Sequence, residues 1–136
     1  MDFKKLMEFR NTNNPYVQRQ GIVVEEISTG YARAVKTVAA EDANPLGIPH
    51  GGVYFTMADT VSGSAMSSYG YKAVTMNATY NFFRSAAVGD KITAEAREIK
   101  HGKTICTYHV QLTGKDGILL GDGTFTFYQL SEKLPI

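Results

Sequence analysis

A long apolar segment with a single ionisable side chain is the feature that most constrains the fold of this chain. Among residues 43–71 the only Asp, Glu, Lys or Arg is Asp59. Residues 53–69 contain no proline and one internal glycine, Gly63. This predicts a helix of roughly 18 residues, about 27 Å long, that begins near Gly51. Because nearly every side of this helix is apolar or small, we expect protein to surround it.

The solitary carboxylate of Asp59 needs a physical explanation. A buried carboxylate without a partner costs several kcal/mol, so Asp59 either bonds to a hydroxyl or backbone group in the core or serves a site. The segment before the helix favours a site, because it combines Asn44, His50, Gly51 and Gly52. Unpaired N–H groups at a helix N-terminus attract negative charge, and glycines let a ligand approach them. This arrangement is a potential oxyanion hole.

Composition limits the protein's class and its partners. The 136 residues, 43% of them hydrophobic, are enough for one domain, which we expect to span residues 1–136. The 14 Lys and Arg nearly balance the 13 Asp and Glu, so neither nucleic acid nor a membrane is an expected partner. A single cysteine, Cys106, fits a reducing compartment. Residues 1–10 lack the apolar core of a signal peptide, so a cytoplasmic location is expected.

The other elements are expected to form a sheet around the long helix. Phe3, Leu6 and Met7 have helical spacing and predict a short helix before the break at Asn14-Pro15. Six strands are predicted, at Ile22–Ile27, Tyr31–Ala39, Val74–Phe83, Lys91–Ile99, Thr104–Thr113 and Ile118–Tyr128. Because the strands do not alternate with helices, the pattern favours an antiparallel α+β fold.

The pattern Asn44-x-x-Gly47-x-x-His50-Gly51-Gly52, followed by Ala58-Asp59, resembles the signature of a known enzyme family. The family is that of the hot-dog-fold acyl-CoA thioesterases, of the phenylacetate-degradation (PaaI-type) and 4-hydroxybenzoyl-CoA thioesterase-like subfamily. The segment from Tyr80 to Ala86 and the turn Val88-Gly89-Asp90 are also similar to it. The resemblance implies a long central helix wrapped by a curved antiparallel β-sheet, in homodimers that commonly pair into tetramers. It also implies hydrolysis of an acyl-CoA without metal or organic cofactor, with coenzyme A as part of the substrate.

The same resemblance assigns roles to individual residues. The backbone N–H of Gly51 matches the donor that polarises the thioester carbonyl. Asp59 matches the acidic residue that acts as general base or as nucleophile. His50 and Asn44 match residues that place the thioester and the Gly51 loop, and Asn77 aligns with a residue that orients the water.

Further residues are candidates for binding the substrate. Cationic side chains at predicted strand ends either bind the phosphates of CoA or form a solvated rim. The candidates for substrate and CoA binding, beside Asn77, are Gly52, Arg84, His101 and Lys103. An aryl or a medium-length aliphatic acyl group would suit an apolar lining, for which the sequence offers Tyr54, Phe55, Met57, Met66, Tyr69 and Tyr71.

The spacing of the two central residues predicts a site shared between subunits. Gly51 and Asp59 are eight residues apart, which is about 12 Å along a helix and too far to serve one carbonyl. Two antiparallel copies of the helix across a two-fold axis would bring Gly51 of one chain near Asp59 of the other.

Other chemistry has weaker support in the sequence. The three histidines, His50, His101 and His109, are too scattered for a zinc pattern, so no metal ligands are predicted. Cys106 alternates with apolar residues on a predicted strand and is expected to be a core thiol. Two functions other than thioester hydrolysis stay open: a hot-dog hydratase or dehydratase, and a non-catalytic acyl-CoA-binding module.

Overall fold

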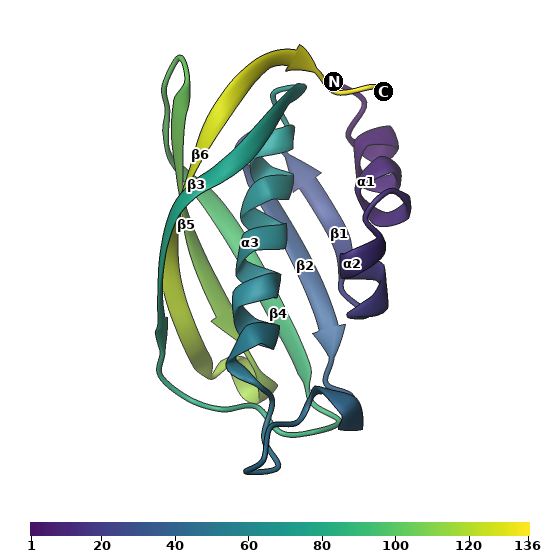
Figure 1. Cartoon of the computed structure of the whole chain (residues 1–136), viewed down its shortest axis with the longest axis vertical. Helices are drawn as coiled ribbons and strands as arrows, with labels where there is room; N and C mark the ends of the chain where they lie inside the picture. The colour runs from purple at the N-terminus through teal and green to yellow at the C-terminus, as the bar shows by residue number, and fades with distance from the viewer.

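The computed structural model describes residues 1–136, in which a curved six-stranded sheet wraps around one long helix, α3 (Gly51–Ser67) (Figure 1). Two short helices, α1 (Phe3–Thr12) and α2 (Pro15–Arg19), lie on the β1 side of the sheet (Figure 1). The strands are β1 (Val23–Ser28), β2 (Tyr31–Thr37), β3 (Tyr71–Phe82), β4 (Lys91–His101), β5 (Ile105–Thr113) and β6 (Leu119–Lys133). Two single turns of 3₁₀ helix, η1 (Ala40–Asp42) and η2 (Lys115–Gly117), complete the chain.

The N-terminal helices begin at residues that satisfy free backbone N–H groups. The Asp2 carboxylate accepts a hydrogen bond from Lys5 N and caps α1. The predicted break at Asn14-Pro15 ends α1 as expected, but it also begins α2. Asn14 caps this second helix, and the fixed φ of Pro15 suits its first position.

Helix α3 confirms the predicted long helix and begins at Gly51 as expected. Its 17 residues lie across the inner face of the sheet (Figure 1), and 11 of them are buried. The six positions that stay open or half-open are Gly51, Gly52, Phe55, Thr56, Asp59 and Gly63. They recur every three or four residues, so they share one face of the helix, and Asp59 belongs to this open face.

The strand order is β1-β2-β4-β5-β6-β3, and every pair is antiparallel. The predicted antiparallel α+β class and the β1–β2 hairpin are therefore confirmed. Strands β3 and β6 are longer than predicted, because Tyr71 of one pairs with Lys133 of the other beyond the apolar stretch of either. The order leaves β3 at an edge of the sheet, with β6 as its only neighbour.

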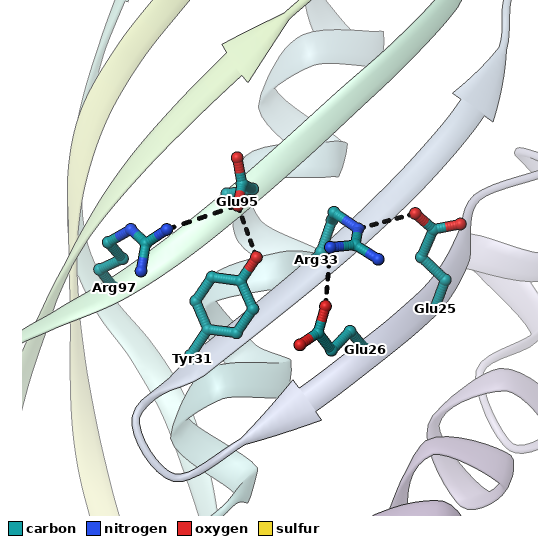
Figure 2. Close-up of polar contacts among 6 residues, drawn as sticks. All are labelled: Glu25, Glu26, Tyr31, Arg33, Glu95 and Arg97. Atoms are coloured by element: carbon teal, nitrogen blue, oxygen red, sulfur yellow. Dashed lines mark hydrogen bonds and ion pairs between the residues drawn. The ribbon is translucent and has the colours of Figure 1, made fainter.

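The outer face of the β1–β2–β4 region carries paired charges. Figure 2 shows Arg33 between two carboxylates, with Nε 2.8 Å from Glu25 and Nη1 2.7 Å from Glu26. A bulge in β1 between Val24 and Glu26 lets these consecutive glutamates reach the same partner. On the next strands the Tyr31 hydroxyl donates to Glu95 (Figure 2). These groups are polar and partly exposed, so this face needs no apolar cover.

The core is a cluster of 26 buried hydrophobic residues between α3 and the sheet. Cys106 is buried in it with the alternate residues Tyr108, Val110 and Leu112 of β5, which confirms the expected core thiol. None of the helices has the length and apolar character needed to cross a membrane.

Candidate active site

Asn44 shapes the loop that leads into α3. Its side-chain oxygen accepts hydrogen bonds from the backbone N–H of Leu46 at 2.9 Å and of Ile48 at 3.3 Å. The backbone N–H of Asn44 donates to the Ile48 carbonyl at 2.8 Å. Gly47 completes the turn with φ of +79°, a conformation that favours glycine. Asn44 is therefore placed to hold the loop before His50 rather than to contact Asp59.

The first turn of α3 leaves one backbone donor free. The Gly52 N–H donates to the Nδ1 of His50 at 2.8 Å, and the Val53 N–H donates to the His50 carbonyl at 2.9 Å. The Gly51 N–H makes no hydrogen bond in the chain. A Cβ at position 51 would stand 3.4 Å from the ring of Phe82. Gly52 and His50 therefore cap the helix, the Gly51 N–H stays free, and its oxyanion role stays a prediction.

A buried ion pair anchors this loop, and the sequence analysis did not identify it. The Nζ of Lys36 lies 2.9 Å from Asp42, and the two side chains are only 4% and 8% exposed. The Asp42 carboxylate also accepts a hydrogen bond from the Ala39 N–H at 2.7 Å. The backbone carbonyl of Asp42 accepts one from the His50 N–H at 2.9 Å. One signal was present: Lys36 shares the inward register of β2 with Ala32 and Ala34. A lysine at an inward position requires a partner.

The Asp59 carboxylate bonds to a hydroxyl and also faces a cavity. It is half-buried and accepts a hydrogen bond from the Thr75 hydroxyl of β3 at 2.7 Å. It also lines a cavity of about 530 Å³, here called the Asp59 cavity, between α3, β3, the α1–α2 segment and the end of β6. The carboxylate is thus partly solvated and within reach of a bound molecule.

Asn77 lies on the opposite face of the sheet from Asp59. Thr75 pairs with the buried Phe127, whereas Asn77 pairs with Thr126, whose hydroxyl meets Thr107 across the outer face. Residues two apart in a strand normally share a face, but a register shift between Thr75 and Asn77 breaks the alternation. The hydroxyl beside Asp59 therefore belongs to Thr75, and the water-orienting role expected of Asn77 has no support within the chain.

The predicted acyl lining divides into three groups. Phe55, Met66 and Tyr71 line the Asp59 cavity. Tyr54 and Met57 are buried in the core. The ring of Tyr69 stacks on the ring of His101 with 3.6 Å between centroids, away from the cavity.

The remaining candidates do not meet within one chain. Arg84 is exposed in the segment between β3 and β4, near the N-terminal end of α3, whereas His101 and Lys103 lie at the far end of β4. The Nδ1 of His101 lies 3.3 Å from the Cys106 sulfur. Burial is the main cause that raises the pKa of this thiol. No three His, Cys, Asp or Glu side chains gather closely enough to hold a metal ion.

The Asp59 cavity does not include the start of α3. His50 and Gly52 line a separate hollow with Lys36 and Asp42. One chain therefore offers a carboxylate in one cavity and a free N–H donor two turns earlier on the same helix. This combination suits acyl transfer, in which one group stabilises an oxyanion and another attacks the acyl carbon or activates water.

Comparison with known proteins identifies the family. Residues 46–120 match the model of the thioesterase superfamily, and the chain belongs to this family. It is 31% identical over 103 residues to the acyl-coenzyme A thioesterase PaaI of Escherichia coli K12, a match covering 76% of this chain and 74% of that protein. The structure of the E. coli PaaI protein superimposes with a TM-score of 0.92 at 25% identity, covering 96% of this chain and 94% of that one.

A Streptococcus mutans UA159 structure bound to acetyl CoA has a TM-score of 0.79 and 26% identity. The match covers 83% of this chain and 91% of that one. Together these similarities confirm the hot-dog fold and the PaaI-type thioesterase resemblance.

Proposed function

We propose that this protein is a thioester hydrolase that converts an acyl-CoA to the free acid and coenzyme A. The observation that carries the proposal is the Asp59 carboxylate, held by Thr75 at the wall of a partly apolar cavity, eight residues after the free N–H of Gly51. Its relatives include a protein named as an acyl-CoA thioesterase and a structure bound to acetyl CoA.

In the proposed reaction the thioester carbonyl oxygen accepts a hydrogen bond from the Gly51 N–H. Negative charge develops on this oxygen as the acyl carbon is attacked, so the donor stabilises the transition state more than the substrate. Asp59 either attacks the acyl carbon itself or removes a proton from the attacking water. The carbon–sulfur bond then breaks and the thiolate of CoA leaves. If Asp59 is the nucleophile, water hydrolyses the resulting acyl-aspartyl anhydride.

We further propose that the working unit is a homodimer, with dimers pairing into a tetramer. Strand β3 has a neighbour on one side only, and apolar side chains are exposed along it and on the open face of α3. They are Phe55, Val74, Met76, Phe82 and Phe83. Two copies with antiparallel α3 helices would cover these groups and bring Gly51 of one chain to Asp59 of the other.

The first test measures release of free thiol from a panel of aryl and aliphatic acyl-CoAs. The wild type should hydrolyse some of them, and Asp59→Asn should lower kcat by at least about a hundredfold, because the amide keeps the size of the side chain but is neither base nor nucleophile. Unchanged circular dichroism would show that the variant folds.

Other results of this assay would favour the alternative functions. Uniformly slow turnover that Asp59→Asn leaves unchanged would favour a binding module, and hydration of an enoyl-CoA would favour a hydratase. The proposed reaction needs no cofactor or metal, so adding EDTA should leave the rate unchanged. The cytoplasmic location stays a prediction.

A further inference from the structure

Arg10 of α1 reaches across the open face of α3 into the wall of the Asp59 cavity. Its Nε donates to the Ser64 hydroxyl at 3.2 Å, and its Nη2 donates to the Thr60 carbonyl at 3.4 Å. A Cβ at position 63 would stand 3.2 Å from Nη2, so Gly63 leaves the space that this side chain occupies. One turn of α3 thus holds the guanidinium of a residue from α1 at the cavity.

This guanidinium has no anionic partner in the chain. The arginines that form ion pairs are Arg33 and Arg97 on the outer face of the sheet. Burial lowers the pKa of Arg10, and the negative charge of Asp59 acts in the opposite direction. Arg10 is half-buried, so its guanidinium loses part of its hydration without gaining an ion pair, and an anionic ligand bound beside it would be stabilised.

One nitrogen of Arg10 is free to bond to a further group. Nη1 makes no hydrogen bond within the chain. Two side-chain polar atoms are fully buried without a hydrogen bond, Tyr80 Oη and Gln129 Oε1. Nη1 is not one of them, so it is accessible to solvent. The free N–H groups of Nη1 are therefore available to a bound molecule, while Nε and Nη2 fix the plane of the guanidinium.

We propose that Arg10 binds a carboxylate at the far end of the acyl group, so that the preferred substrates are CoA thioesters of dicarboxylic acids. This proposal rests on the proposed function, because it takes the thioester carbon to lie at Asp59. The Arg10 contacts lie on residues 60–64, and the last two of these, Gly63 and Ser64, lie about 6–7.5 Å from Asp59 along the helix axis. A six-carbon diacid spans roughly this distance, since its chain has about five C–C bonds near 1.5 Å each.

The rest of the cavity suits the middle of such an acyl group. Phe55, Met66 and Phe127 supply apolar walls of the same cavity. The distal carboxylate would accept hydrogen bonds from the guanidinium of Arg10, which has no ion-pair partner in the chain. Hydrogen bonds between ionised groups are stronger than those between neutral groups. Arg10 also lies outside residues 46–120, the part that matches the superfamily, so it can select a substrate without belonging to the shared catalytic machinery.

The test compares adipyl-CoA with hexanoyl-CoA, which differ only in the terminal carboxylate. The wild type should have the higher kcat/KM for adipyl-CoA. Arg10→Met should lower kcat/KM for adipyl-CoA by at least about tenfold and leave that for hexanoyl-CoA within about twofold. The matched control Arg97→Met removes an outer-face arginine and should change neither value.

A merely structural role of Arg10 predicts a different result. Arg10→Met leaves the Ser64 hydroxyl bonded to the Thr60 carbonyl at 2.7 Å, so the helix keeps its own hydrogen bonds. If the ratio of kcat/KM for adipyl-CoA to kcat/KM for hexanoyl-CoA were the same in the variant as in the wild type, whether or not both values fell, the proposal would be wrong.

A binding experiment separates this proposal from the thioesterase function itself. Calorimetric titration of the Asp59→Asn protein with both thioesters measures affinity without hydrolysis. Adipyl-CoA should bind at least about tenfold more tightly, and adding Arg10→Met should abolish the difference. Equal affinities would overturn the role of Arg10. Discrimination in binding together with an inactive wild type would instead overturn only the proposed hydrolysis.

Discussion

At the scale of single residues, the hydroxyl of Thr75 is the polar group most closely tied to the Asp59 carboxylate. A hydrogen bond to a charged group fixes its orientation and contributes about 1.5–3 kcal/mol. Replacing Thr75 by valine keeps the shape of the side chain and removes this bond. We therefore expect Thr75→Val to lower kcat about tenfold or more, measured by thiol release under saturating acyl-CoA.

The control for this substitution is Thr79→Val. Thr79 lies on the same strand but pairs with Thr124 on the outer face of the sheet, so its replacement should leave kcat unchanged. Equal losses in the two variants would mean that the effect comes from β3 as a strand and not from the hydroxyl at Asp59.

The site residues differ in how visible they are in the sequence. Asp59 and Gly51 stand out because a lone carboxylate in an apolar helix and a glycine pair at its start are local patterns. Thr75 could not be predicted, because its face depends on a register shift that only the pairing with β6 reveals. Arg10 was missed because its position beside Gly63 requires α1 to pack on α3, a contact between distant segments.

At the scale of elements, the Lys36–Asp42 ion pair connects β2 to the loop before α3. Removing one member of a buried pair leaves an unpaired charge and costs about 3–5 kcal/mol. Lys36→Met should therefore lower the free energy of unfolding by about 3 kcal/mol, measured by urea denaturation.

Two comparisons isolate this pair. Adding Asp42→Asn to Lys36→Met should restore part of the stability, because the second change removes the unpaired charge. Lys72→Met breaks the exposed Lys72–Glu132 pair and should change stability far less. A loss in Lys36→Met no larger than that in Lys72→Met would contradict the anchoring role.

Most elements were predictable because their periodicity reflects one buried face. The β1–β2 hairpin, the long helix and the four later strands follow from such patterns and from glycine turns. The end of β6 could not be predicted, because Ser131 to Lys133 show no apolar alternation. These residues become strand only through pairing with the start of β3. The helix α2 was missed because five residues are too few to show helical periodicity.

At the scale of the whole molecule, the proposed shared site can be tested by mixing two inactive proteins. Gly51→Pro removes the free N–H at the first helical position, where proline is tolerated, and Asp59→Asn removes the carboxylate. Each homodimer should be nearly inactive. A mixed dimer has one site with both defects and one intact site, so random exchange should restore roughly a quarter of wild-type activity.

This experiment requires proof that subunits exchange, which native mass spectrometry of the mixture supplies. Verified mixed dimers that are as inactive as their parents would show that Gly51 and Asp59 do not meet across a subunit boundary.

Four tyrosines predict a loss of stability in alkali. Burial, followed by the hydrogen bond to Glu98, raises the pKa of Tyr69 to about 12. Burial also raises the pKa of Tyr31, of Tyr80 and of Tyr108. An unfolded tyrosine titrates near pH 10, so above that pH the unfolded chain binds fewer protons than the folded one. The contribution of these tyrosines to stability should therefore be constant below about pH 9, and stability should fall as the pH rises through 10 toward 12.

Urea denaturation at several pH values between 8 and 11 checks this expectation. Tyr108→Phe keeps the buried ring and removes one of these four ionisable groups, so its stability should depend less steeply on pH than that of the wild type. Identical slopes would show that Tyr108 does not contribute.

The Asp59 cavity has one consequence for how this enzyme can be divided or transplanted. Its wall includes Arg10 near one end of the chain and Leu134 near the other, with Asp59 and Thr75 between them. The segment 46–120 that matches the superfamily contains the proposed oxyanion donor, Gly51, and the Asp59 carboxylate but only part of this wall. The proposed catalytic groups and the residue proposed to set substrate preference therefore lie on different portions of the polypeptide. A chimera that combined residues 46–120 of this protein with the flanking segments of a relative would take its acyl selectivity from that relative.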